Sequence, residues 1–137
     1  MTLQFNALIV VANIIALLFS ATAFAGQAPV APSGFGLFVN YCASCHGPQA
    51  KGDGPVAAAM QKKPADLTTI AKRSGGKFPT DTVFRTIDGR NLVLGHGGQG
   101  MPVWSDVFLR APGATGPADI KAKIDALVAY LESIQQK

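Results

Sequence analysis

Both cysteines of the chain lie in the heptapeptide YCASCHG at residues 41–47, with a histidine directly behind the second one. Cys42, Cys45 and His46 have the spacing i, i+3 and i+4, so on a helical turn their side chains project toward one side. A pair this close allows a disulfide, a thiol redox switch, half of a metal site, or a covalent anchor for another group. The fold has to accommodate whichever of these it is.

The spacing favours covalent attachment of haem. Two thiols on one side of a helical turn can form thioethers with the two haem vinyl groups, and the adjacent imidazole can reach the iron. A thioredoxin-like pair needs a helix N-terminus, whereas this pair follows an apolar helical pattern. A zinc site would need His46 and His96, and His46 next to Cys45 departs from zinc spacing. A Cys42–Cys45 disulfide would close a very small loop and constrain little.

The N-terminal segment has the pattern of an export signal. An apolar run at residues 7–19 is followed by small residues and an A-x-A-like site at residues 23–25, although the first six residues lack Lys and Arg. We therefore predict a signal peptide at residues 1–25 and one domain at residues 26–137, with its core at about residues 32–136. The alternative is a retained membrane anchor, and only then would the protein be membrane-associated. Both predict a domain in an exported compartment, the periplasm or its equivalent.

The rest of the chain predicts an all-α fold of short helices and long loops. Ser33 is a potential N-cap for a helix that reaches Tyr41, and Thr80 is another, for a helix that Gly89 would end. Residues 56–63 predict a helical turn or two, whereas residues 64–79 and the glycine-rich stretch at 90–104 predict mostly irregular structure. Pro117 begins the clearest helix, whose apolar stripe consists of Ile120, Ile124, Leu127, Val128, Leu131 and Ile134.

Because much of the predicted chain is loop, its core buries little apolar area to offset the entropy lost when the chain is ordered. A large, flat, apolar cofactor would add the buried area that is missing. The net charge is +4, with scattered basic residues. A net positive charge can favour binding to nucleic acid. Scattered charges on an exported domain argue against that class of partner.

Taken together, these features resemble the class I, small bacterial monohaem cytochrome c family over about residues 32–136. Gly34, Phe38 and Cys42 match its N-terminal helix, CASCHG its attachment site, and LVAYLESI at residues 127–134 its C-terminal helix. The resemblance implies a cytochrome c fold wrapped around one haem c, attached through Cys42 and Cys45. It also implies that the two terminal helices pack together, with Gly34 allowing their backbones to approach closely and Tyr130 as its packing partner.

His46 and Met101 are the predicted iron ligands. Met101 lies in GQGMPVW, far enough along the chain to reach the opposite face of a haem, and Pro102 favours an extended backbone before it. The family also places its axial methionine after the mid-chain loops. Met60, close behind His46, and His96 are the rival sixth ligands.

Three further residues are assigned by the resemblance or by their chemistry. The family implies that Pro55, in GDGP, accepts the hydrogen bond of the second His46 ring nitrogen. Trp104 is expected to donate its indole N–H to a haem propionate, with core packing as the alternative. Arg90 is expected either to pair with a propionate or to lie on the surface.

The resulting prediction is an electron carrier and not an enzyme. Its partners are expected to be redox proteins that bind transiently, with an acidic docking face that contacts the lysines of this protein. One alternative is a dedicated electron-transfer subunit of a larger oxidoreductase complex. The other is a haem sensor or enzyme with an open distal site.

Overall fold

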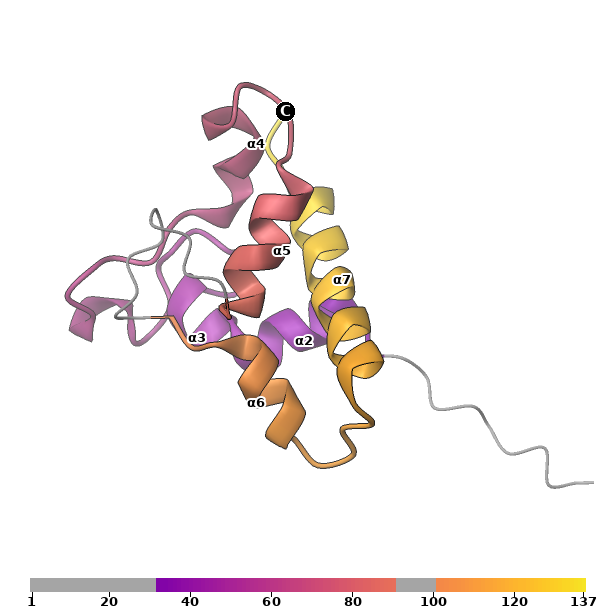
Figure 1. Cartoon of the computed structure of the whole chain (residues 1–137). Coiled ribbons are helices and arrows are strands. Elements are labelled where there is room, and N and C mark those ends of the chain that lie inside the picture. Colours follow the sequence, from indigo (N-terminus) through magenta and orange to yellow (C-terminus); the bar gives the residue numbers. More distant parts are fainter. Residues whose placement is uncertain (1–31, 91–100) are drawn as a thin grey trace, which may run out of the picture. The chain divides into compact units, whose positions relative to one another are not determined.

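The computed structural model describes residues 32–90 and 101–137, and all regular structure within these ranges is helical (Figure 1). The predicted leader at residues 1–25 lies outside the described residues, as does His96, one of the rival sixth ligands. None of the helices in the described part is long and apolar enough to cross a bilayer. The helices are α2 (Gly34–Tyr41), α3 (Ala43–His46), η1 (Ala57–Ala59), η2 (Leu67–Thr69), α4 (Ile70–Arg73), α5 (Thr80–Asp88), α6 (Trp104–Arg110) and α7 (Pro117–Ser133).

Helices α2 and α7 cross in close contact, as the family resemblance implies. The Ser33 hydroxyl caps α2 by accepting a backbone N–H from its first turn at 3.1 Å. At Gly34 a Cβ would overlap the carbonyl oxygen of Ala126 and would lie 2.8 Å from the Cβ of Tyr130. The Tyr130 ring packs on that of Phe38, which is fully buried, with ring centroids 5.2 Å apart. Gly34 is therefore the residue that lets the two helix backbones meet.

The core forms where α5 and α6 pack against α7 and α2. Five residues of the predicted α7 stripe are buried, and Ile134, just beyond the helix, is only partly buried. Helix α5 ends at Gly89 in the left-handed conformation (φ 73°), as predicted, but its N-cap is Pro79 and not Thr80. The buried side chains of the core are Leu37, Phe38, Ala50, Phe78, Val83, Ile87, Phe108, Ile120, Ile124, Leu127, Val128 and Leu131.

Three short elements differ from the prediction. Helix α6 was not expected, and it has no side-chain N-cap; it forms because Phe108, 1% exposed, is anchored in the core. In the segment expected to be irregular, the Asp66 side chain caps η2, which leads directly into α4. The turn predicted at residues 56–63 is only the 3-10 helix η1. Helices this short depend on tertiary packing rather than on intrinsic propensity.

Candidate functional site

The C-x-x-C-H motif forms one helical turn at the junction of α2 and α3. Cys42 ends α2 and precedes α3, and its carbonyl accepts the backbone N–H groups of Cys45 at 3.1 Å and His46 at 2.9 Å. Gly47 ends the turn with φ 79°. The two thiols and the imidazole therefore have the helical spacing that the sequence predicts.

Both cysteines are half-buried, and within the described residues neither forms a disulfide. Cys42 does precede a helix, contrary to the expectation that the pair lies at the wrong end for a redox motif. Burial, and to a lesser extent the Cys45 thiolate, nevertheless raise the pKa of Cys42 to about 11. A thiol with so little thiolate at neutral pH is a poor redox switch.

The His46 ring is oriented by a hydrogen bond between its Nδ1 and the Ala65 carbonyl oxygen, 3.0 Å away. Because a carbonyl oxygen can only accept, Nδ1 carries the proton and the lone pair lies on Nε2. Burial lowers the pKa of His46, and the bond to Ala65 partly opposes this. In the neutral ring, Nε2 is therefore the nitrogen that could bind a metal.

The prediction that the Pro55 carbonyl accepts the hydrogen bond of the His46 ring is wrong, because Ala65 is the acceptor. The residues on either side of Pro55 are hydrogen-bonded to the backbone of α3. Gly54 N–H donates to Cys45 O at 3.1 Å, and Val56 N–H donates to Ser44 O at 3.1 Å. Pro55 itself is exposed. A Gly-Pro at the family's spacing therefore forms a turn behind the motif instead of the acceptor.

Ala65 is the site residue that the sequence analysis missed. The segment that carries it packs on the loop behind the motif: Leu67 N–H donates to Ala50 O at 2.7 Å, and a Cβ on Gly52 would overlap the Pro64 carbonyl. A signal for it was present in the sequence. Pro64 and the capping residue Asp66 flank Ala65, and such residues mark a turn that holds one carbonyl in a set direction.

Trp104 begins α6 and closes an aromatic cluster with Tyr41 and Phe108. Its ring lies 5.7 Å from that of Tyr41, which directly precedes Cys42, and 5.9 Å from that of Phe108. Its Nε1 is buried and finds no hydrogen-bond partner among the described residues. Buried indole N–H groups normally have one, so this donor suits an acceptor that the described residues do not supply.

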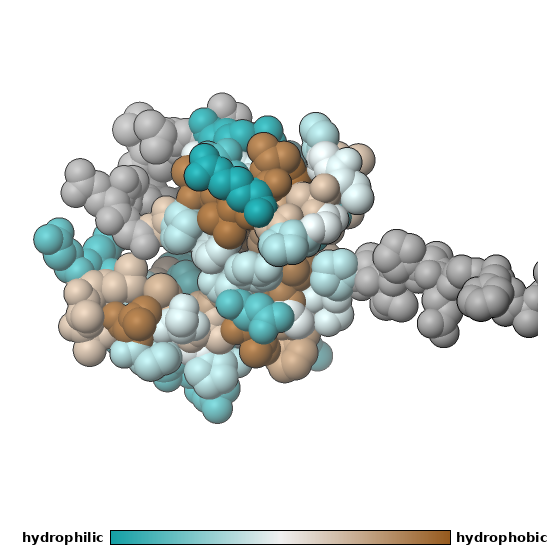
Figure 2. All heavy atoms as spheres, turned by 90° about the horizontal axis from the view of Figure 1, so that it is seen from below, coloured by the Kyte–Doolittle hydropathy of each residue, from teal (hydrophilic) through white to brown (hydrophobic). Residues whose placement is uncertain are grey.

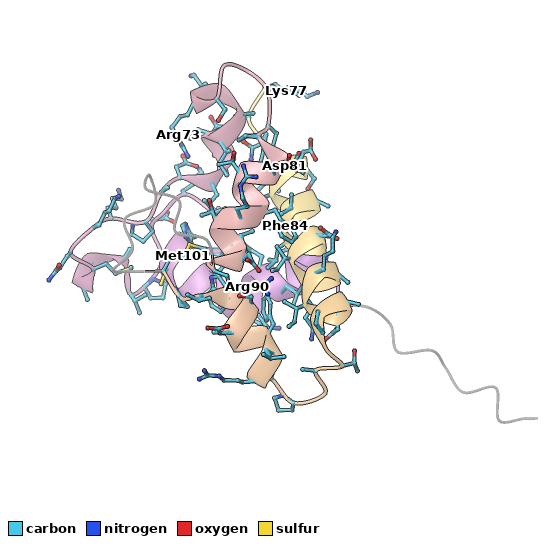
Figure 3. All side chains as sticks on the ribbon, in the orientation of Figure 1. Arg73, Lys77, Asp81, Phe84, Arg90 and Met101 are labelled. Carbon is cyan, nitrogen blue, oxygen red and sulfur yellow. The ribbon has the colours of Figure 1, made fainter. Side chains whose placement is uncertain are left out.

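Arg90 does not project as an isolated cation. Its guanidinium donates from Nε to both carboxylate oxygens of Asp88 at 3.0 Å, and from Nη2 to one of them at 2.7 Å (Figure 3). Asp88 is buried, and it offsets the charge of Arg90. Arg90 is exposed, in agreement with the alternative of a surface position. Its pairing with a propionate stays a prediction.

Met101 is 39% exposed, and the described residues on either side of residues 91–100 contact each other. A Cβ on Gly89 would lie 2.9 Å from the Cα of Val103, and the Ser105 hydroxyl donates to Asp88 O at 2.7 Å. Met101 precedes Trp104 by three residues, so the Cα atoms of Met101 and Trp104 lie within about 10 Å of each other. Met60, its rival among the described residues, is half-buried just after η1.

The arrangement fits haem c. Two thiols that form no disulfide and an imidazole oriented by Ala65 lie on one turn. The indole N–H, which has no partner among the described residues, belongs to the aromatic cluster next to it. In the described residues no three His, Cys, Asp or Glu side chains gather as a metal site.

One comparison with known proteins gives a match. A family model described as "Cytochrome C oxidase, cbb3-type, subunit III" matches residues 29–131. Neither the curated proteins nor the solved structures include a significant match to this chain.

Proposed function

Since the chain belongs to the cytochrome C oxidase, cbb3-type, subunit III family, a family of cytochrome c domains, we propose that it is a single-haem electron carrier, not an enzyme, with His46 and Met101 as iron ligands. A cytochrome c domain has a haem-based role in electron transfer. Haem c, attached through the C-x-x-C cysteines, supplies a one-electron iron couple.

The observation that carries the proposal is the His46 imidazole, held by Ala65 on the same turn as two unpaired thiols. Cys42 and Cys45 anchor the group, so the ring nitrogen and the attachment points keep one relative position. The hydrogen bond at Nδ1 holds the ring plane and makes Nε2 a better donor. A ligand fixed in this way has little to rearrange when the charge on the metal changes.

Met101 is proposed as the second ligand because it lies three residues before Trp104, whose ring packs on Tyr41 beside the motif, and because GQG precedes it in sequence. The test is the weak far-red sulfur-to-iron band of the oxidised protein. We expect the band in the wild type and in Met60→Leu, and its loss in Met101→Leu. Met101→Leu should also bind carbon monoxide readily when reduced, whereas the wild type should not. A wild type without the band, or a band lost in Met60→Leu, would refute Met101; His96→Ala then tests the remaining rival.

Trp104 is proposed to donate its buried Nε1–H to a haem propionate, since this donor has no partner in the described part of the chain. A carboxylate that accepts such a bond is stabilised in its ionised form. The pH dependence of the reduction potential tests this proposal.

Redox partners are proposed to meet a basic surface. Residues 51–77 carry six of the twelve basic residues but only two of the eight acidic ones, so the whole net charge of +4 belongs to this segment. All six of these side chains are exposed, and Figure 3 shows Arg73 and Lys77 at its α4 end. Hydrophobic side chains are exposed between hydrophilic ones on the face in Figure 2, which suits small transient contacts. Electron transfer to an acidic partner should slow as ionic strength rises.

The second candidate is a dedicated subunit of a larger complex, favoured by the family description, which names an oxidase subunit. Residues 1–25 are proposed as a cleaved signal peptide of a periplasmic protein, the alternative being an anchor that faces the periplasm. Intact mass of the exported protein decides between cleavage and retention. Gentle extraction followed by sizing of the native haem protein then separates a free carrier from a stable subunit.

A further inference from the structure

The C-terminal tail is fastened to the segment that carries Ala65. Just beyond α7, the side chain of Gln135 bonds at both ends: its Oε1 accepts the Ala71 N–H at 2.9 Å, and its Nε2 donates to the carbonyls of Leu67 at 2.8 Å and Leu131 at 2.6 Å. Gln135 is thereby joined to residues far away in the sequence, and it spans η2 and the start of α4.

The next residue extends the same contact. Gln136 donates its backbone N–H to the Thr68 carbonyl at 2.8 Å and its Nε2 to the Thr68 hydroxyl at 2.8 Å. Thr68 in turn donates its N–H and its hydroxyl to Asp66 Oδ1 at 2.9 and 2.6 Å. The hydrogen bonds therefore run from the tail to the residue next to Ala65.

Leu67 is the point where this network meets the haem-binding motif. Gln135 holds its carbonyl, while its N–H donates to Ala50 O in the loop behind His46. Ala65 is only two residues away, and its carbonyl receives the Nδ1–H of His46. A shift of Leu67 is carried to Ala65, because so short a piece of backbone has few torsions to absorb it.

We propose that Gln135 is a positioning residue for His46: it fixes residues 65–71 so that the Ala65 carbonyl stays on Nδ1, and thereby helps to set the reduction potential. This inference rests on the proposed function, since His46 must bind the iron. A Nδ1–H that donates strengthens the imidazole as an electron donor and so favours the oxidised metal. Loosening the tail should raise the potential.

The test compares the full-length haem protein with Gln135→Leu, which removes the donor and the acceptor without adding charge. The matched control is Ser133→Ala at the same helix end, because the exposed Ser133 hydroxyl donates only to the Tyr130 carbonyl. We expect hydrogen exchange at the Ala71 amide to accelerate roughly tenfold or more in Gln135→Leu, as two hydrogen bonds to the segment are lost. The His46 Nδ1 proton of the reduced protein should also exchange faster, and the potential should shift positive. Ser133→Ala should match the wild type.

A milder variant covers the case in which Gln135→Leu fails to fold. Gln135→Asn keeps the amide on a shorter side chain that cannot reach both Ala71 and Leu67, so the same changes should appear at smaller size. The inference is overturned if Ala71 exchanges faster while the Nδ1 proton and the potential stay at wild-type values, or if Ala71 does not change. If the oxidised wild type lacks paramagnetically shifted His46 ring signals, the proposed function itself fails, whatever the variants do.

Discussion

Replacing Gly34 by alanine tests the close crossing of α2 and α7. The new methyl group would overlap the carbonyl oxygen of Ala126 and lie 2.8 Å from both the carbonyl carbon of Ala126 and the Cβ of Tyr130. Two of these three atoms belong to the backbone of α7 and cannot rotate away. The helices must therefore move apart, because carbon atoms pack best about 3.5–4.0 Å from each other.

The separation needed is about 1 Å, and it loosens the contacts of Phe38 and Leu127, which are at most 1% exposed. Overpacking of this kind costs about 1–3 kcal/mol. The higher helix propensity of alanine returns at most about 1 kcal/mol, and less at the first residue of a helix. We expect Gly34→Ala to lower the free energy of unfolding by about 2 kcal/mol, a factor of about 30 in the folded-to-unfolded ratio.

The assay is guanidinium unfolding of the haem protein, followed by the Soret band and by fluorescence of Trp104, the one tryptophan of the chain. Gly36→Ala is the matched control, since its Cβ would meet only the Ser33 hydroxyl, at 3.1 Å. That variant should change the free energy of unfolding by less than about 1 kcal/mol. The denaturant slope should stay constant in both. Equal stability of Gly34→Ala and Gly36→Ala would refute the close approach.

Three further predictions concern the aromatic cluster, Asp66 and the indole donor. Phe108→Ala should lower the free energy of unfolding by about 3–5 kcal/mol, because Phe108 is 1% exposed and packs on Tyr41 and Trp104; a loss below about 1 kcal/mol would contradict this packing. The hydrogen bond from Thr68 is the main cause that holds the pKa of Asp66 below its ordinary value of 3.8. The ionised carboxylate therefore stabilises the fold above pH 3.8, and this contribution is lost as the pH falls through the lowered pKa of Asp66. The stability difference between the wild type and Asp66→Asn, measured by urea unfolding, should therefore be present at pH 7 and shrink below pH of about 4; a constant difference would argue against it. Trp104→Phe should move the pH dependence of the reduction potential to higher pH, as the propionate loses its donor, and an unchanged profile would remove Trp104 from the proposed site.

Features that follow from local periodicity were predictable. The motif turn needs only the helical spacing of Cys42, Cys45 and His46, and the start of α2 needs only a serine before an apolar pattern. The α7 stripe and the left-handed Gly89 were likewise readable, because a helix period and a positive φ leave marks in consecutive residues. The contact at Gly34 came from the family resemblance, and the structure bears it out.

The partners of these residues were decided by the tertiary structure. Ala65 is the acceptor for His46 and not Pro55, because the loop at residues 54–56 is bonded to the outside of α3 while the segment at residues 64–67 packs over the motif. Helix α6 forms because Phe108 has a place in the core, whereas the pairing of Arg90 with Asp88, two residues before it, is local.

The sequence by itself therefore determined which side chains lie together on one helical turn, since spacing along a helix is a local property. What holds that turn was decided by the fold: the Ala65 carbonyl on His46, and the Gln135 amide on the segment that carries it. A carbonyl is common to every residue, and Pro64 and Asp66 beside Ala65 mark only a turn, so the sequence does not say which donor this carbonyl meets. Only long-range packing brings one particular carbonyl within hydrogen-bonding distance of one ring nitrogen.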